Sequence, residues 1–445
     1  MLRVCGKFLL ILRGDDMKIN IITYGCTANQ GDSYLMESVL EKAGHKITDF
    51  DDADYVIVNT CAVKEATENK IASKLSKLAK SDKKIIVGGC LTKVSLKRIK
   101  KSVPNFSGIL DTRSVDKLPE IIKGAENGRE NQIIFSDQSP VKPNLIKNPH
   151  SLTGIVQISE GCDLSCTYCA TTIARGDLQC FSKEEIVRAA SYLVRNGSKE
   201  ILLTSQDNGA YNLSGVKLPK LLTSICNIEV DFFLRNGMTN PVYLNSIITP
   251  LIVAYENPKI YKFLHIPVQS GSNSILKKMK RGYTAETFRK FVSEFRKNIP
   301  KLTLSTDIIV GFPEETTEDF TKTKELLKEI RFDIVNLSKF GPRPGTEATK
   351  MEQLERGIVN KRSSEISSLI KKIYLEKNRE WVGWQGPVLV NQGSDLVQIG
   401  KEKSFIARNI YYKPISIKTG SEILGKTLKV KIIGSTAVNL IGEIA

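Results

Sequence analysis

The feature that most constrains this chain is the run C-x-x-x-C-x-x-C formed by Cys162, Cys166 and Cys169. Three thiolates this close in sequence can converge on one metal centre, so the fold must hold their loop in a fixed shape. A structural zinc site normally has four protein ligands, and Cys180 is the nearest candidate for a fourth. Three cysteines can instead hold three irons of a 4Fe-4S cluster and leave the fourth iron open to a ligand that is not protein. The missing fourth ligand favours a cluster over a zinc site or unrelated buried thiols.

Apolar β-type runs alternate with helical patterns over residues 17–135, as in the strand run DYVIVNT and the helix expected at 32–43. This alternation predicts an α/β domain with a parallel sheet covered by helices on both faces. Three of the strand runs end in a cysteine, at Cys26, Cys61 and Cys90. Because ligands gather at the carboxyl ends of parallel strands, we expect these thiols to meet on one rim. Independent buried cysteines are the alternative, since free cysteine is often buried.

Residues 136–150 contain three prolines and no periodic pattern, which predicts a linker. Over residues 151–380 the β and α patterns return, and they predict a partial (β/α) barrel with its chemistry at the C-terminal strand ends. The candidates for binding a cofactor fall at or near those ends: Ser205, Asp207, Arg235, Gln269, Ser270 and Gly311.

The last part of the chain, residues 381–445, changes to short β-type runs separated by glycine and asparagine, which predicts a small all-β, OB-like barrel. Tyr411 and Tyr412 stand beside Arg408 and Lys413, and aromatic rings among cations can stack on bases while the cations hold phosphates. Core packing is the better prediction for either tyrosine taken alone.

Charge adds a clue about partners, because the formal net charge is +17 over 445 residues. Such an excess of lysine and arginine favours nucleic acid, although a basic surface can also serve only solubility. Nine cysteines against three histidines, in clusters, favour metal ligation in a reducing compartment such as the cytoplasm. No apolar run approaches the roughly 20 residues of a membrane span, so no membrane partner is expected. Residues 1–16 lack signal-peptide features and are interpreted as a dispensable extension or the product of an upstream start, in which Cys5 has no assigned role.

From Met17 to Ala445 the chain resembles the radical S-adenosylmethionine (SAM) methylthiotransferase family. The motifs that carry the resemblance are TYGCTANQGDS around Cys26, VNTCAVK around Cys61, GGC at Cys90, the Cys162 run, HIPVQSGSNSILKKMKRGYT, TDIIVGF and FGPRPGT. The C-terminal part is similar to the TRAM domain, the RNA-binding module of that family.

The resemblance implies two 4Fe-4S clusters and SAM as cofactors. Cys162, Cys166 and Cys169 would hold the cluster that cleaves SAM. A second cluster, which carries the sulfur, would be held by Cys26, Cys61 and Cys90. One SAM would methylate that sulfur, and another would give a 5′-deoxyadenosyl radical that takes hydrogen from an unactivated carbon, a step beyond any general base.

The segment TTIARG after Cys169 and the motif GCTANQGDS resemble the archaeal and eukaryotic group that modifies N6-threonylcarbamoyladenosine in tRNA. This implies formation of its 2-methylthio derivative at position 37, next to the anticodon of ANN-decoding tRNAs, with a low-potential electron donor and a sulfur donor as partners. Arg343 and Arg235 are candidates to pair with the threonylcarbamoyl carboxylate. The alternatives are action on isopentenyladenosine in tRNA or on a ribosomal-protein aspartate, a second cluster that only relays electrons, and a zinc-stabilised RNA-binding protein.

Two positions depart from the family pattern, because Glu314 and the pair Tyr211–Asn212 stand where glycine is usual. We expect both to alter loops near SAM rather than the clusters. Cys180 and Cys226 match no cluster motif and are expected to be packing residues.

Overall fold

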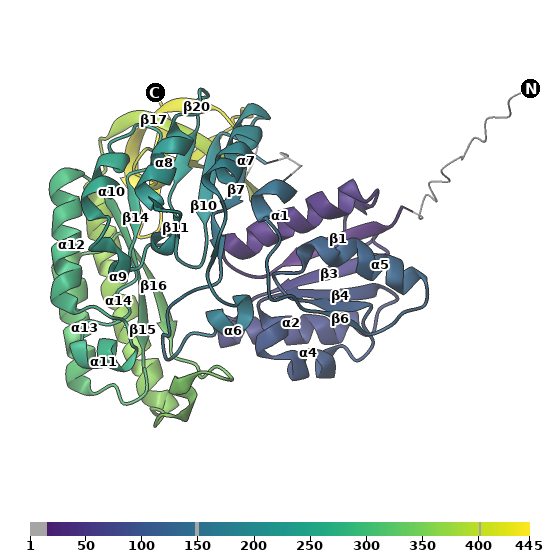
Figure 1. Ribbon diagram of the computed structural model, residues 1–445. Helices are drawn as coiled ribbons and strands as arrows, with labels where there is room; N and C mark the ends of the chain where they lie inside the picture. The colour runs from purple at the N-terminus through teal and green to yellow at the C-terminus, as the bar shows by residue number, and fades with distance from the viewer. Residues whose placement is uncertain (1–15, 147–150, 400–401) are drawn as a thin grey trace, which may run out of the picture.

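The structure is a computed structural model that describes residues 16–146, 151–399 and 402–445. Cys5 and nearly all of the predicted N-terminal extension lie outside these residues, as does the end of the predicted linker. Figure 1 shows an N-terminal α/β unit in purple and blue, a central unit in teal and green, and a small C-terminal barrel in yellow. No helix in the described ranges is long and apolar enough to cross a membrane.

The N-terminal unit is a parallel sheet of order β2-β1-β3-β4-β5-β6 with helices on both faces, as predicted. Its strands are β1 (Lys18–Thr23), β2 (Lys46–Ile47), β3 (Tyr55–Thr60), β4 (Lys84–Gly89), β5 (Gly108–Leu110) and β6 (Gln132–Ile134). Its helices are α1 (Thr27–Lys42), α2 (Glu65–Leu78), α3 (Leu91–Val94), α4 (Leu96–Ser102) and α5 (Leu118–Glu126). Along β3, Val56 and Val58 face the core under α2 and α4, whereas Tyr55 and Ile57 face the core under α1 and α5. A strand buried on both faces has a continuous apolar sequence, and this is why the run DYVIVNT predicts β3.

Helix α1 begins at Thr27, five residues before the predicted start at Asp32. The first turns of α1 bury polar side chains, among them Asn29, Asp32 and Ser33. A periodicity search treats such residues as solvent-facing and places the helix start too late. These buried polar residues lie where the N-terminal unit meets the central one.

The central unit is a parallel sheet that curls into a partial barrel. Its strands are β7 (Thr153–Gln157), β10 (Glu200–Thr204), β13 (Phe233–Arg235), β14 (Phe263–His265), β15 (Thr303–Val310) and β16 (Ile334–Lys339). The order β7-β10-β13 continues into β14-β15-β16 through bridges between Leu234 and Ile260 and between Met238 and His265. The outer helices are α7 (Lys183–Arg195), α8 (Leu218–Cys226), α10 (Ile248–Tyr255), α12 (Ala285–Asn298) and α13 (Thr317–Ile330).

Short elements complete the central unit at the strand ends. They include α6 (Thr171–Arg175), α9 (Pro241–Leu244), α11 (Asn273–Lys278) and the small pairs β8 (Ser159–Glu160) with β9 (Gln179–Cys180) and β11 (Asn212–Leu213) with β12 (Val216–Lys217). Cys226 belongs to the core of this unit and Cys180 packs against it, which confirms that both are packing residues.

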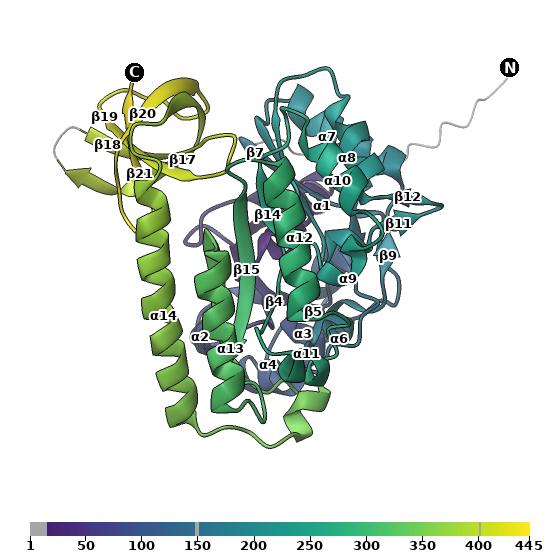
Figure 2. The same cartoon turned by 90° about the vertical axis from the view of Figure 1, so that its left-hand side faces the viewer.

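The long helix α14 (Arg356–Arg379) leads from the central unit to the C-terminal barrel, as Figure 2 shows. The barrel is closed in the order β17-β18-β19-β21-β20. Its strands are β17 (Gln385–Ile399), β18 (Glu402–Arg408), β19 (Pro414–Thr419), β20 (Thr427–Ser435) and β21 (Leu440–Ile444). The predicted small all-β barrel is therefore present.

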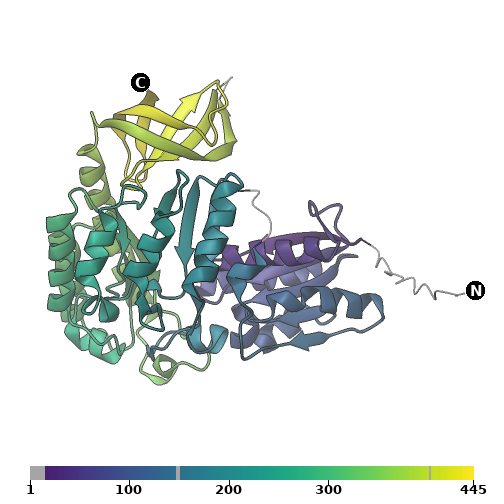
Figure 3. The same ribbon diagram turned by 45° about the horizontal axis from the view of Figure 1, so that its top comes forward.

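The C-terminal barrel is docked on the amino ends of the central strands, which Figure 3 shows beneath it. The Tyr412 ring lies 4.8 Å from that of Tyr261 and 5.0 Å from that of Phe263, the first residue of β14. Lys413 is buried and pairs with Asp333, which directly precedes β16, at 2.7 Å. The interpretation of Tyr412 and Lys413 as RNA contacts is therefore wrong, and the packing alternative is confirmed. Tyr411 likewise packs on Trp381, with ring centroids 5.2 Å apart.

Candidate active site

The three N-terminal cysteines follow the carboxyl ends of β1, β3 and β4, with Cys26 at the N-cap of α1. Two asparagines fix the start of α1 to the end of β3, because the Asn29 amide donates to Asn59 Oδ1 at 2.6 Å and the Asn59 amide donates to the Asn29 carbonyl at 2.8 Å. Gly89 has a φ of 92°, and a Cβ there would lie 2.4 Å from Asn59 Oδ1. Only glycine lets the chain pass this closely before Cys90.

The sulfurs of this N-terminal trio are near enough to influence one another. Burial raises the pKa of Cys61, and the neighbouring Cys26 adds to that effect. Burial also raises the pKa of Cys90 to about 11, while the Arg175 guanidinium acts in the opposite direction. The Nε of Arg175 donates to Cys90 Sγ at 3.2 Å.

The Cys162 run forms a loop between β8 and α6. The Cys162 amide donates to the Gly176 carbonyl at 3.2 Å and the Cys169 amide donates to the Cys166 carbonyl at 3.1 Å, so backbone bonds hold the loop closed. Burial raises the pKa of Cys162 to about 12 and also raises that of Cys169. The three cysteines of this central trio are nonetheless each partly exposed.

Arg281 is the arginine of the central trio, and sequence reasoning missed it. Its Nη1 donates to Cys166 Sγ at 3.1 Å and its Nε donates to the Tyr283 hydroxyl at 3.0 Å. Its Nη2 is buried and has no partner among the described residues. In the sequence Arg281 ends the lysine-rich stretch KKMKR, which is typical of a solvated face, so only the motif around it marked the position.

Asp207, which is close enough to influence Cys162, and Gln269 each present an unpaired polar atom. Asp207 is the N-cap of a short 3₁₀ turn, where its Oδ1 accepts from the amides of Gly209 at 2.9 Å and Asn240 at 3.1 Å, but its Oδ2 has no described partner. Burial raises the pKa of Asp207 to about 7. Gln269 has a φ of 71°, and its buried Oε1 is also without a partner in the described ranges. Buried unpaired donors and acceptors on Asp207, Gln269 and Arg281 suit a ligand with amino and carboxylate groups, as SAM has.

The remaining cofactor candidates are engaged elsewhere or serve the backbone. Arg235 points toward the C-terminal barrel, with its guanidinium 5.2 Å from the Phe263 ring and 5.6 Å from the Tyr412 ring, so it does not join Asp207. The Ser270 hydroxyl is buried against Thr323, and the Ser205 hydroxyl donates to Asn208. The Gly311 amide donates to Glu315 at 2.9 Å. A strand-end position thus identifies the rim but not the direction of each side chain.

The two departures from the family pattern can also be located. Glu314 has a φ of 61°, in the left-handed region that favours glycine, and its carboxylate pairs with Lys278 at 2.8 Å. Tyr211 is buried and its hydroxyl donates to the Phe181 carbonyl at 3.0 Å. Neither residue contacts a cysteine of the two trios.

Of the two arginines expected to bind a substrate carboxylate, Arg343 is engaged with the N-terminal unit, and Arg235 faces aromatic rings with its Nε unpaired among the described residues. Arg343 is buried, and its guanidinium donates to Glu68 Oε2 and to the Val63 carbonyl, both at 2.9 Å. These bonds join the loop after β16 to α2 of the N-terminal unit. Arg235 lies under the C-terminal barrel, as described above.

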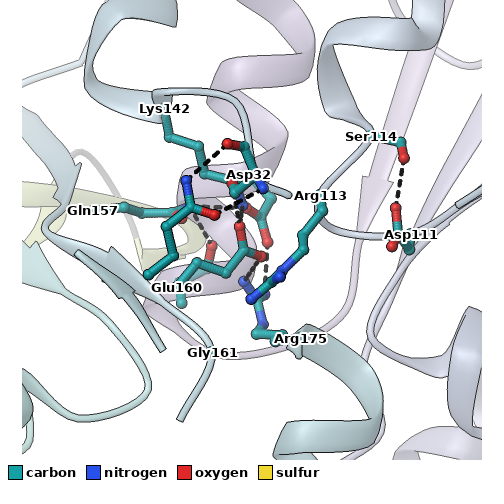
Figure 4. A network of polar contacts seen from close by, with 12 residues as sticks. Asp32, Asp111, Arg113, Ser114, Lys142, Gln157, Glu160, Gly161 and Arg175 are labelled. Atoms are coloured by element: carbon teal, nitrogen blue, oxygen red, sulfur yellow. Dashed lines mark hydrogen bonds and ion pairs between the residues drawn. The ribbon is translucent and has the colours of Figure 1, made fainter. Parts of the chain in front are cut away.

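A second set of buried contacts joins the N-terminal and central units (Figure 4). We call Asp32, Lys142, Glu160 and Arg175 the interface tetrad. Lys142 lies within the predicted linker, yet its side chain is buried between Asp32 and Glu160, at 2.6 and 2.9 Å. Sequence reasoning missed Lys142 because a lysine between prolines is typical of an exposed connection.

No three His, Cys, Asp or Glu side chains in residues 16–146, 151–399 and 402–445 surround one ion position. Cys90 and Cys166 each accept a hydrogen bond from an arginine. Hydrogen bonds to sulfur are among the contacts that tune a 4Fe-4S cluster, so the donor chemistry on these two thiols fits such a group.

Comparisons with known proteins agree with this description. The chain matches the model of "Uncharacterized protein family UPF0004" over residues 18–111 and that of the "Radical SAM superfamily" over residues 156–327. It is 41% identical over 436 residues to a probable threonylcarbamoyladenosine tRNA methylthiotransferase from Pyrococcus abyssi, an alignment that covers 96% of this chain and 99% of that protein. The threonylcarbamoyladenosine tRNA methylthiotransferase of Drosophila melanogaster is 32% identical over 439 residues, which are 96% of this chain and 77% of that one.

A solved structure supports the fold alone. The radical S-adenosylmethionine methyltransferase TsrM from Kitasatospora setae, with cobalamin and a [4Fe-4S] cluster bound, superimposes with a TM-score of 0.54 at 12% identity, over 75% of this chain and 77% of that chain.

Proposed function

This chain belongs to the threonylcarbamoyladenosine tRNA methylthiotransferase family, and from that premise we propose that it converts N6-threonylcarbamoyladenosine at position 37 of tRNA to its 2-methylthio derivative. The match to the family extends over 96% of the chain. A match of this length cannot come from the radical SAM domain alone, because that domain covers only residues 156–327.

The observation that carries the proposal is the meeting of the two cysteine trios at one interface. Arg175, on the helix that follows Cys169, donates to the sulfur of Cys90 in the other unit at 3.2 Å. Helices α3 and α6, which follow Cys90 and Cys169, also pack against each other. A reaction that uses two metal centres on one nucleoside needs both within reach of it.

In this proposal Cys162, Cys166 and Cys169 hold the cluster that binds SAM, and Cys26, Cys61 and Cys90 hold the second cluster. When bound, these groups supply the electron, the radical hydrogen abstraction and the sulfur, which no side chain provides. Arg281 orients the central trio through Cys166, and Asp207 and Gln269 offer polar atoms to SAM.

The partners follow from the same chemistry. We propose ANN-decoding, threonylcarbamoylated tRNAs as substrates, together with a low-potential electron donor and a sulfur donor. A reducing compartment, the cytoplasm, suits the protein because every cysteine in its described part is a free thiol.

The test is nucleoside mass spectrometry of tRNA from cells that lack this protein, complemented with wild type or Cys26→Ala. Wild type should restore the 2-methylthio nucleoside, whereas Cys26→Ala should leave the unmodified threonylcarbamoyladenosine and still cleave SAM in vitro. Cys226→Ala, which removes a core cysteine outside both trios, is the matched control and should restore the modification.

Anaerobically purified protein should carry about eight iron atoms, two 4Fe-4S clusters. Stoichiometric zinc without iron would leave only an RNA-binding protein. Normal thiolation by Cys26→Ala would show that the N-terminal cluster does not carry the sulfur and at most relays electrons. Appearance of the methylthio group on isopentenyladenosine instead would keep the class and change the substrate.

A further inference from the structure

We propose that Arg175 is a positioning residue that couples the two cysteine trios: it donates to a sulfur of one trio while the interface tetrad fixes it to the loop that carries the other. The proposal rests on the proposed function, because it takes Cys90 to be a cluster ligand.

Each nitrogen of the Arg175 guanidinium has a different partner. Nη2 lies 2.6 Å from Asp32 Oδ2, Nη1 lies 3.2 Å from Glu160 Oε1, and Nε donates to Cys90 Sγ at 3.2 Å. These bonds fix both the position and the plane of the guanidinium. A lysine ammonium cannot reproduce such a planar, three-way contact.

The partners of Arg175 come from segments that also carry the cysteines. Asp32 lies on α1, whose N-cap is Cys26. Glu160 stands just before Cys162 in the chain, and Arg175 ends the helix that follows Cys169. A shift of either trio relative to the other would therefore strain at least one bond of Arg175.

The interface tetrad is unusually buried for four charged residues. Its two acidic and two basic side chains are each at most 3% exposed. Its carboxylates are otherwise satisfied, since Gln157 donates to Asp32 Oδ1 at 2.8 Å and the Ser139 hydroxyl donates to Glu160 Oε2 at 2.6 Å. Because burying two ion pairs costs desolvation that apolar packing would avoid, we attribute their presence to positioning.

A donor on a ligating sulfur also favours the more reduced, more negative state of a cluster. Arg281 makes the corresponding contact with Cys166 at 3.1 Å, so each trio has one arginine of its own. Removal of Arg175 should therefore take away the donor on the N-terminal cluster and leave the Arg281 donor on the other in place.

The experiment measures the midpoint potential of the N-terminal cluster by anaerobic potentiometric EPR, in a protein whose Cys162, Cys166 and Cys169 are changed to alanine. Two charge-matched variants are compared in this background. Glu160→Gln/Arg175→Gln removes the donor to Cys90. Lys142→Gln/Glu160→Gln removes the same number of charges from the tetrad and keeps the donor.

We expect loss of Arg175 to lower the ratio of reduced to oxidised cluster about tenfold at a fixed potential, a shift of about 59 mV for a one-electron couple. The Lys142 variant keeps the donor and its Asp32 contact, so its potential should shift less than that of the Arg175 variant. If the Arg175 double variant does not fold, Arg175→Lys, which keeps the buried charge, should shift the potential in the same direction.

An unchanged potential without Arg175, or equal shifts in both double variants, would overturn the inference and leave the proposed function standing. A background protein that binds no iron at Cys26, Cys61 and Cys90 would overturn the proposed function, and the inference with it.

Discussion

Asp333 is one of the residues that join the C-terminal barrel to the rest of the chain. It pairs with Lys413 at 2.7 Å and with Lys377 of α14 at 2.8 Å, and its own side chain is only 3% exposed. Burial opposes its ionisation, but Lys413 and Lys377 outweigh burial and hold the pKa of Asp333 below its ordinary value of 3.8. A carboxylate that is easier to ionise in the folded protein stabilises it wherever the group is charged.

Asp333→Asn should therefore cost about 3 kcal/mol at neutral pH, because it leaves the buried Lys413 and the partly buried Lys377 without their partner. The two tryptophans of the chain, Trp381 and Trp384, pack in or against the barrel core, so urea denaturation followed by tryptophan fluorescence reports on this region. Lys403→Gln, which breaks an exposed pair with Glu422, is the control and should cost less than about 1 kcal/mol.

The Asp333 contribution should also depend on pH in one direction. Because the folded pKa is depressed, the stabilisation is fully present above about pH 4 and is lost as the pH falls through the folded pKa. The difference between wild type and Asp333→Asn should shrink on acidification below pH 4. A difference that stays constant down to pH 3 would show that the carboxylate charge is not what anchors the barrel.

The same residues show where sequence reasoning stops. Tyr412 and Lys413 form a sequence that suits RNA, and only the docking of the barrel on Phe263 and Asp333 reveals that they are interior. The buried position of Lys142 could not be predicted for the same reason, because its partners Asp32 and Glu160 are distant in sequence. Local sequence reports the chemistry of a side chain, whereas its partner comes from a segment far along the chain.

At the scale of elements, continuous apolar runs such as those of β3 and β4 were recognised, because strands buried on both faces are apolar throughout. The start of α1 was not, because its first turns bury polar groups against the central unit. The cysteines at strand ends were found by topology alone, since parallel strands share one carboxyl edge. The side-chain directions of Arg235 and Ser270 could not be predicted in this way. A position at a strand end places a residue at the edge of the sheet but does not determine its rotamer.

The C-terminal barrel still presents lysines outward, although its central aromatics are interior. Lys418 of β19 and Lys429 and Lys431 of β20 are exposed. We expect these lysines to hold tRNA phosphates, so changing all three to glutamine should weaken tRNA binding and reduce its salt slope by up to about three.

Filter binding across a salt series measures this, with unfolding midpoints to show that the fold is intact. Changing the exposed Lys70, Lys77 and Lys80 of the N-terminal unit to glutamine removes the same charge and is the matched control. Equal losses in both triple variants would mean that general charge, rather than the barrel, determines affinity.

For the whole molecule, a net charge of +17 predicts that tRNA binding is dominated by counterion release. A complex with at least about six phosphate contacts should lose about a thousandfold or more in affinity between about 50 and 200 mM salt. Measuring the binding of unmodified and threonylcarbamoylated tRNA at constant temperature across this range of salt concentrations tests the prediction. A nearly flat dependence would assign the positive charge to solubility instead.

The C-terminal barrel sits against the first residues of β10 and β14, at Glu200 and Phe263, whereas the cysteine loops follow the opposite ends of the strands. A tRNA that binds the barrel while one of its bases is modified at the cysteine loops must therefore extend along the full length of the central strands. A free nucleoside or a very short oligonucleotide cannot contact the barrel and the cysteine loops at the same time. It therefore lacks the added affinity that a full-length tRNA gains from binding at both places, so the protein selects substrates by size.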